Sequence, residues 1–200
     1  SRHRLVAWGV TTLGFEGRKF QSEGAPEALR IDPGRAMWVA LDIGSGPGRE
    51  DGRPLVIWIM DLPSDPTISR RRIAGETSRL LASWQGTIFR RAQDSPPRLD
   101  GERPRTEWRA DTSLASSGFP KPDVMVGDFN IPRCSHSLRL LTRGFDWSMQ
   151  NAFDQAGIGY VATWPIQFPL WHIDQAFIAD GLRATSYKVV NPRAGLHWLQ

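Results

Sequence analysis

Short apolar segments separated by turn-rich sequence are the feature that most constrains the fold of this chain. The segment 54–62 (PLVIWIMDL) is apolar almost throughout, which is typical of a strand buried on both faces. Further extended runs are predicted at 5–12, 35–43, 123–129, 172–178 and 184–190. Because one clear helical pattern accompanies these runs, the sequence predicts an α/β (α+β) layer structure with antiparallel hairpins.

The clear helix follows segment 54–62. Asp65 and Pro66 are a suitable N-cap and first helical residue. Behind them, one buried stripe at helical spacing is predicted, formed by Ile73, Thr77, Leu80, Leu81 and Trp84. A small second helix is predicted near Ser135.

Two turn-rich segments connect these elements. Residues 44–53 (GSGPGREDGR) predict a long hairpin between the strands on either side. Residues 86–122 are rich in Arg, Pro, Ser and Asp and show little periodicity, and connections longer than about 15 residues are usually functional or disordered. We interpret 86–122 as a flexible surface insertion within a single domain that spans residues 1–200.

The composition limits the class of protein. With 40% hydrophobic and 23% charged residues, the chain is globular and not disordered. Its longest apolar run, 55–60, is too short to span a membrane, which predicts a soluble domain without a transmembrane segment. A lone cysteine, Cys134, excludes a disulfide framework. The net charge of +4 would suit a polyanion, but only three of the 25 basic residues are lysines, and an arginine bias can also reflect genome composition.

The strongest candidate site is Gly127-Asp128-Phe129-Asn130, at the end of the predicted strand 123–129. Side chains at the carboxyl end of a strand can project into a ligand crevice, and Asp128 and Asn130 would share one face. The carboxylate can bind a hard cation or orient a water, and the amide can donate to a phosphoryl oxygen. The alternative is a turn in which both side chains only cap backbone groups.

Asp174 is the second candidate, because it lies in the strand-like sequence 172–178 among apolar residues. An embedded carboxylate is costly without a partner, so Asp174 is interpreted as orienting a histidine in an acid/base dyad. The alternative is a buried aspartate satisfied by backbone donors. One intervening hairpin could bring His197 to Asp174, although a histidine beside Trp198 is more often a partly buried surface residue.

These segments together resemble the endonuclease/exonuclease/phosphatase superfamily. VMVGDFN at 124–130 matches the family's Gly-Asp-Phe/Leu-Asn motif. HIDQAFIAD at 172–180 matches a second motif, apart from Gln175 where histidine is frequent. Thr163-Trp164-Pro165 is also typical of members. The resemblance implies the deoxyribonuclease-I-like fold, a layered sandwich of two mixed β-sheets flanked by helices.

The chain departs from the family pattern at several positions. The segment 54–66 is similar to a family strand that ends in His-Leu, but Asp61 replaces the histidine. Leu196 replaces the acidic residue expected before His197. The family's early Asn and its metal-binding Glu motif have no match, and segment 5–12 is more similar to the family's middle strand. We therefore expect that about the first third of the family domain is absent from this sequence, as in a fragment of a longer protein; the alternative is loss of the metal site.

The resemblance implies metal-assisted hydrolysis of a phosphate ester, with Mg²⁺ or Mn²⁺ as cofactor and nucleic acid among the candidate substrates. Asp128 would orient or deprotonate the attacking water and help to hold the cation. Asn130 would bind a non-bridging phosphate oxygen. Asp174 and His197 would form a dyad that stabilises the charge on phosphorus.

Two other functions compete with hydrolysis. A non-catalytic binding module would keep the fold without the metal site, which the departures at Asp61 and Leu196 favour. A nucleic-acid-binding domain would use the arginines between 90 and 109, but acidic residues interleave with them. Three tryptophans could line a cleft, although tryptophan is more often a core residue: Trp164, Trp171 and Trp198.

Overall fold

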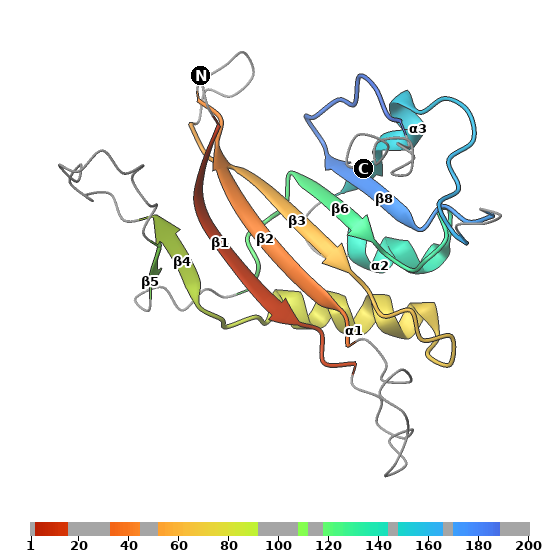
Figure 1. Cartoon of the computed structure of the whole chain (residues 1–200), viewed down its shortest axis with the longest axis horizontal. Coiled ribbons are helices and arrows are strands. Elements are labelled where there is room, and N and C mark those ends of the chain that lie inside the picture. The colour runs from red at the N-terminus through yellow and green to blue at the C-terminus, as the bar shows by residue number, and fades with distance from the viewer. Residues whose placement is uncertain are drawn as a thin grey trace, which may run out of the picture.

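A computed structural model describes residues 3–15, 33–44, 52–91, 108–111, 118–143, 148–165 and 170–188. Its strands form one eight-stranded mixed sheet in the order β5-β4-β1-β2-β3-β6-β8-β7 (Figure 1). The strands are β1 (Arg4–Thr12), β2 (Arg35–Asp42), β3 (Leu55–Asp61), β4 (Ile88–Arg91), β5 (Trp108–Asp111), β6 (Val124–Asp128), β7 (Met149–Asn151) and β8 (Asp174–Ala179). The helices are α1 (Arg70–Ala82), the 3₁₀ turn η2 (His136–Leu138), α2 (Arg139–Thr142) and α3 (Ala152–Ala156).

The predicted α/β class is confirmed, and so are the strands that became β1, β2, β3, β6 and β8. The predicted hairpin between β2 and β3 is also present, with antiparallel pairing from Arg35 opposite Asp61 to Leu41 opposite Leu55. The described strands make one sheet, so the second sheet of the predicted sandwich is not among them. None of the described helices is long and apolar enough to cross a membrane.

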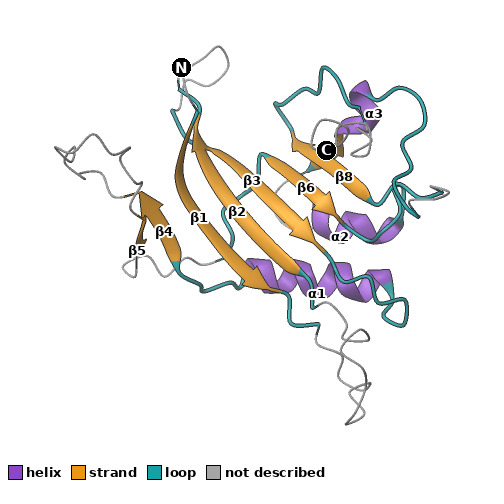
Figure 2. Cartoon of the chain, viewed as in Figure 1, coloured by secondary structure: helices purple, strands orange, loops and turns teal. Residues whose placement is uncertain are grey.

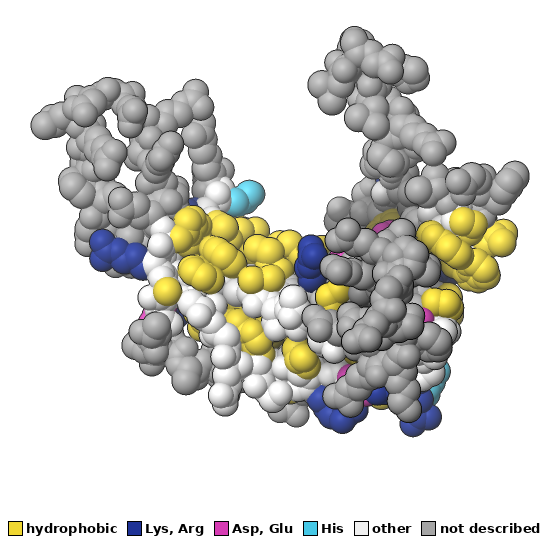
Figure 3. Space-filling view, turned by 60° about the horizontal axis from the view of Figure 1, so that its bottom comes forward, with side chains coloured by type: hydrophobic (Ala, Val, Ile, Leu, Met, Phe, Trp, Pro, Cys, Tyr) yellow, Lys and Arg dark blue, Asp and Glu magenta, His cyan; other side chains and the backbone are white. Residues whose placement is uncertain are grey.

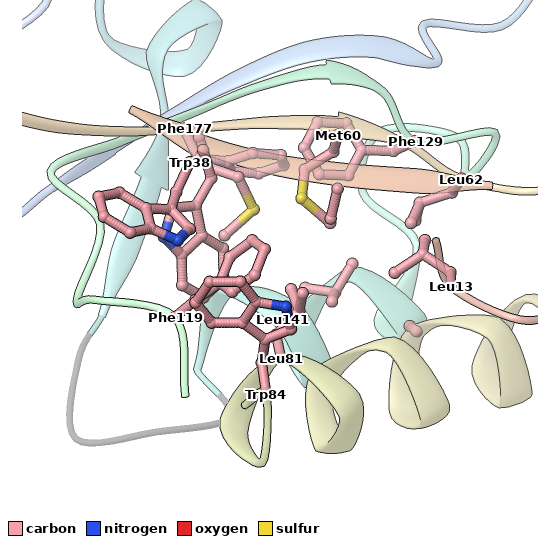
Figure 4. Packing of buried hydrophobic residues seen from close by; sticks show 14 of the residues in the cluster. Leu13, Trp38, Met60, Leu62, Leu81, Trp84, Phe119, Phe129, Leu141 and Phe177 are labelled. Atoms are coloured by element: carbon pink, nitrogen blue, oxygen red, sulfur yellow. The ribbon is translucent and has the colours of Figure 1, made fainter. Parts of the chain in front are cut away.

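Helices α1 and α2 lie against one face of the sheet (Figure 2). Alternate side chains of the strands point toward these helices, which is why Trp38, Trp58 and Met60 are buried. The predicted stripe of α1 packs against them, with Leu81 fully buried and Trp84 nearly so (Figure 4). One hydrophobic core therefore lies between the sheet and the helices.

The opposite face of the sheet is also apolar but less covered. It carries Trp8, Val39 and Ile57, which are half-buried, and Val10 and Ile59, which are 48% and 43% exposed. Figure 3 shows hydrophobic side chains gathered in a band on the molecular surface. This pattern explains why segment 54–62 is apolar at nearly every position.

The register of the parallel pair β3 and β6 is fixed by a buried carboxylate at its start. Asp123 accepts hydrogen bonds from Arg53 Nη2 at 2.6 Å and from the backbone amide of Val56 at 2.8 Å. Its own amide donates to the carbonyl oxygen of Val56. Because pairing then proceeds residue by residue, Asp61 lies opposite Asp128 at the far end of the two strands.

Helix α1 begins later than the sequence predicts. The carboxylate of Asp65 accepts hydrogen bonds from the amide and hydroxyl of Thr67, at 2.8 and 2.7 Å, and so closes a turn before the helix. Ser69 is the actual N-cap, since its side chain accepts from the amide of Arg72. The small helix near Ser135 is confirmed, with Ser135 as the N-cap of η2.

Two other expectations were wrong in part. The segment 86–122, predicted as a surface insertion, contributes β4 and β5 to one edge of the sheet; residues 92–107 and 112–117 lie outside the described residues. Phe89 stacks on Trp8 with ring centroids 4.2 Å apart, so aromatic packing holds this edge. The predicted strand 184–190 forms only an isolated bridge at Tyr187 within its described part.

Candidate functional site

Three aspartates lie side by side at one end of the sheet. Asp61 is the last residue of β3 and pairs with Asp128, the last residue of β6. Asp128 also pairs with Asp174, the first residue of β8. Because paired residues on neighbouring strands point to the same face, the three carboxylates form a row on the face away from the helices. This row, called the carboxylate row below, joins the sequence candidates Asp128 and Asp174 with Asp61, the residue that stands where the family pattern has a histidine.

Asp128 is the central and most buried member of the carboxylate row. Its Oδ1 accepts a hydrogen bond from the backbone amide of Asn130 at 2.8 Å. Burial raises the pKa of the Asp128 carboxyl above its usual value, and the charges of Asp174 and Asp61 raise it further. The Asn130 amide and the charge of Arg70 act in the opposite direction without cancelling the increase.

Gly127 allows β6 to lie very close to β3 immediately before Asp128. Its φ of +140° is one that glycine adopts readily. A Cβ at this position would lie 1.9 Å from the carbonyl oxygen of Met60 on β3. The glycine of the motif is therefore needed for the close approach of β6 to β3 next to Asp128.

Asn130 lies just beyond β6 with a positive φ of 46°. Its Nδ2 donates to the carbonyl oxygen of Leu62 at 2.7 Å, and the amide of Leu62 donates to the carbonyl oxygen of Asp128 at 2.9 Å. These two hydrogen bonds thus connect the segment that follows β3 to the segment that follows β6. The two side chains of Asp128 and Asn130 do cap backbone groups in a turn, and the same turn places Asn130 beside the carboxylate row.

The burial of Asp174 differs from the prediction. It is exposed, not buried, because it begins β8 and its side chain faces away from the helices. The buried residue is its neighbour Gln175, which donates to the carbonyl oxygen of Ile131 at 2.8 Å and accepts from Asn151 at 3.0 Å. Gln175 therefore has a structural role on the face opposite to Asp174.

His197 and Trp198 lie outside the described residues, so the dyad of Asp174 with His197 stays a prediction. The other two candidate cleft tryptophans are at the surface instead of in the core: Trp164 is 49% exposed and Trp171 is 44% exposed.

Arg70 is a charged neighbour of Asp128 that the motifs in the sequence do not indicate. It is the first residue of α1, and its guanidinium donates to the carbonyl oxygens of Pro63 at 2.9 Å and Ser64 at 3.2 Å. A cation in the first turn of a helix opposes the helix dipole. Three consecutive arginines at 70–72, with no acidic residue in that turn, are therefore unfavourable for the helix itself. This unfavourable placement is the feature of the sequence that could have pointed to a role for Arg70 outside the helix.

His172 precedes Asp174 by two residues and is almost fully buried. Its Nε2 is 3.1 Å from the hydroxyl of Tyr187, and its Nδ1 has no hydrogen-bond partner among the described residues. Burial lowers the pKa of His172, and the charge of Arg133 lowers it further; Asp174 and Asp154 act in the opposite direction. The folded protein therefore keeps this imidazole neutral near neutral pH.

The buried imidazole predicts a loss of stability on mild acidification. The unfolded chain takes up this proton near pH 6.5, whereas the folded chain resists it, so the free energy of unfolding falls as the pH drops below about 6.5. The slope from this residue is at most about 1.4 kcal/mol per pH unit. Urea unfolding at pH 5.5, 6.5 and 7.5 should show a shallower decline for His172→Gln than for the wild type. His136→Gln, at an exposed position, is the control; equal slopes in all three proteins would refute the prediction.

The donor set of the carboxylate row suits a hard divalent cation. Its side-chain oxygens are of the kind that Mg²⁺ prefers, and Mg²⁺ is usually held by one or two carboxylates together with waters. No group of three His, Cys, Asp or Glu side chains among the described residues is arranged to enclose a metal ion. Asp128 with one neighbour could therefore supply only part of a coordination shell.

One family model matches this chain. The model of the endonuclease/exonuclease/phosphatase family matches residues 24–197. No curated protein matches the chain. Among solved structures, an endonuclease/exonuclease/phosphatase family protein from Bacteroides thetaiotaomicron is similar at 13% identity and a TM-score of 0.44, over 90% of this chain and 52% of that one. A mannosyl-6-phosphatase from Bacteroides thetaiotaomicron VPI-5482 gives 12% identity and a TM-score of 0.43, over 96% and 61%.

This chain thus spans about half to three fifths of the length of those two proteins. The family match covers most of the chain and includes the strand ends that build the carboxylate row. The chain belongs to the endonuclease/exonuclease/phosphatase family.

Proposed function

We propose that this chain is a phosphoester hydrolase domain in which water attacks a phosphate ester. The observation that carries the proposal is the carboxylate row: Asp128, at the end of the family motif, has Asp61 and Asp174 in register on either side. A half-buried carboxylate flanked by two others is costly, and such groups are concentrated at functional sites.

Asp128 is proposed as the residue that orients the attacking water and accepts its proton. A raised pKa makes a carboxylate a better proton acceptor at neutral pH. Its Oδ1 is already held by the amide of Asn130, which fixes the orientation of the side chain. The hydrogen bond from the Asn130 amide and the charge of Arg70 both act against the increase in this pKa.

Asn130 is proposed to donate to a non-bridging phosphate oxygen. Its side-chain amide has two N–H groups, and one of them is used by the carbonyl oxygen of Leu62. That hydrogen bond would position the second N–H group. Asp174 retains its proposed role as the partner of His197.

Asp128, assisted by Asp61, would hold a Mg²⁺ or Mn²⁺ ion. When bound, such an ion supplies polarisation of the phosphoryl group and stabilisation of the leaving oxygen. It would also offset the repulsion within the carboxylate row, which raises the pKa of Asp128.

The second candidate is a binding module that has kept the fold but not the activity. It is favoured by the absence, within the described residues, of three side chains that could enclose a metal ion. Asp61 in place of the expected histidine and Leu196 before His197 point the same way.

Hydrolysis of bis-p-nitrophenyl phosphate and p-nitrophenyl phosphate by this chain, with Mg²⁺ or Mn²⁺ and with EDTA, separates the two candidates. A hydrolase is expected to release p-nitrophenol only with the metal and to lose activity in EDTA. Circular dichroism must show the same fold in both conditions. A folded chain without turnover at any metal concentration would exclude catalysis by this chain alone and favour the binding module.

A further inference from the structure

Arg70 is a half-buried cation whose side chain is bonded to the loop that follows Asp61. Residues 62–69 lead from the end of β3 to the start of α1 (Figure 1). The guanidinium of Arg70 reaches back into this loop and donates to the carbonyl oxygens of Pro63 at 2.9 Å and Ser64 at 3.2 Å. The side chain is therefore held at the end of β3 where the carboxylate row lies.

Asn130 is bonded to the same loop, one residue earlier. Its Nδ2 donates to the carbonyl oxygen of Leu62 at 2.7 Å, and the amide of Leu62 donates to the carbonyl oxygen of Asp128 at 2.9 Å. Leu62 and Pro63 are consecutive, so their Cα atoms are about 3.8 Å apart. The donor groups of Asn130 and Arg70 are thus anchored to neighbouring carbonyl groups beside the end of β6.

The positive charge of Arg70 is not neutralised by these bonds, because both acceptors are uncharged carbonyl groups. Within the described part of the chain, Arg70 forms no salt bridge, whereas the nearby Arg72 pairs with Glu76 at 2.7 Å. The charge of Arg70 also lowers the pKa of Asp128, so the two groups lie within electrostatic reach of each other. The carboxylate row therefore has a fixed cation as its neighbour.

The guanidinium of Arg70 keeps donors for a ligand. A guanidinium has five N–H groups, and the loop uses one on Nη1 and one on Nη2. The planar arrangement of these groups matches two oxygens of a phosphate, whereas a lysine acts only as a point charge. Since the carboxylate row repels a phosphate anion, a cation fixed beside it favours binding of that anion.

We propose that Arg70 binds two non-bridging oxygens of the phosphoester, one of which Asn130 also contacts. This inference rests on the proposed function and adds a phosphate-binding residue to it. Phosphate monoesters and diesters both present two such oxygens, so they are the two sources of this ligand. Arg70 offsets the repulsion between the phosphate and the carboxylate row, and Asp128 keeps its role toward the attacking water.

Binding is tested without hydrolysis by calorimetric titration of two probes that contain no P–O–C bond, both in Mn²⁺. Phenylphosphonate represents a monoester and methylphenylphosphinate a diester. Arg70→Met removes the charge and the N–H groups, and it should weaken binding about 10- to 100-fold, the usual effect of losing a hydrogen bond to a charged group. Loss with phenylphosphonate alone identifies a monoester site, and loss with both probes a site that also accepts diesters.

Arg70→Lys keeps the charge without the planar donor arrangement, so its affinity for the probes should lie between those of Arg70→Met and the wild type. It decides the question if circular dichroism shows that Arg70→Met does not fold. Arg71→Met is the matched control, because Arg71 is the next residue of the same helical turn and is exposed. This control should bind both probes as the wild type does.

Titration of Mn²⁺ without a probe separates phosphate binding from a purely structural role. Removing a positive charge near the carboxylate row should leave Mn²⁺ affinity unchanged or increase it. If Arg70 only holds the loop after Asp61 in place, its replacement should instead weaken Mn²⁺ and both probes together.

Equal probe affinities of the wild type and the Arg70 variants would overturn the inference, and so would a parallel loss of Mn²⁺ affinity or a wild type that binds neither probe. Each of these results leaves hydrolysis of the p-nitrophenyl esters as a separate test of the proposed function. Conversely, probe binding that depends on Arg70 in a chain that hydrolyses nothing would retain the phosphate site and refute only the catalytic role.

Discussion

Replacing Asp128 by asparagine is expected to lower metal-dependent phosphoester hydrolysis by about 10²- to 10⁴-fold, the contribution that a positioned general base usually makes. Asparagine keeps the Oδ1 atom that accepts the Asn130 amide, so the local turn should survive. It removes the negative charge and the proton-accepting oxygen. The measurement is kcat with saturating Mn²⁺, together with Mn²⁺ affinity by titration.

The same substitution should leave the melting temperature unchanged or raise it. Burial and the charges of Asp174 and Asp61 raise the pKa of Asp128, which means that ionising this carboxyl costs more free energy in the folded protein than in the unfolded chain. A neutral side chain relieves this cost. Opposite effects on activity and stability are typical of a residue retained for function.

Asp42→Asn is the matched control for Asp128→Asn. Asp42 is an exposed carboxylate at the end of β2, near Arg4 and far from the carboxylate row. Its replacement should change neither kcat nor Mn²⁺ affinity. Full activity in Asp128→Asn, or a loss explained by a lower melting temperature, would remove Asp128 from the proposed mechanism.

The parts of the site that could be predicted from sequence are those set by local backbone geometry. Gly127 and Asp128 are predictable because Gly-Asp-Phe-Asn follows an apolar strand pattern, and the structure ends β6 at Asp128. The core stripe of α1 was predictable for the same reason, since helical spacing determines which residues face the sheet.

The parts that could not be predicted depend on contacts between distant segments. The sequence offers Asp61 as a possible neighbour of the site, but its pairing with Asp128 depends on the register of β3 and β6, which Asp123 helps to fix and which joins strands more than 60 residues apart. The exposure of Asp174 depends on which face of β8 meets the helices, and the apolar sequence around it suggested burial. Edge strands β4 and β5 have only four residues each and show no clear alternation of apolar residues, so the sequence does not predict them. Their attachment to the sheet includes a long-range contact, the stacking of Phe89 on Trp8.

Gly127→Ala is expected to have the largest effect on stability, a loss of about 4 kcal/mol or more in the free energy of unfolding. Two costs add. Alanine must adopt a φ of +140°, and its Cβ would lie 1.9 Å from the Met60 carbonyl oxygen and 2.8 Å from the carbonyl carbon. These are backbone atoms of the central strand β3, so neither can move without breaking the pairing with β2 or β6.

Gly44→Ala separates the two costs. Gly44 also has a positive φ, +74°, but a Cβ there would meet nothing within 4 Å, so only conformational strain of about 1 kcal/mol is expected. Urea unfolding of both variants measures the difference. Any Gly127→Ala protein that folds should also lose hydrolysis, because relief of the clash moves Asp128 relative to Asp61. Similar stabilities for the two variants would show that β6 does not approach β3 as closely as the glycine requires.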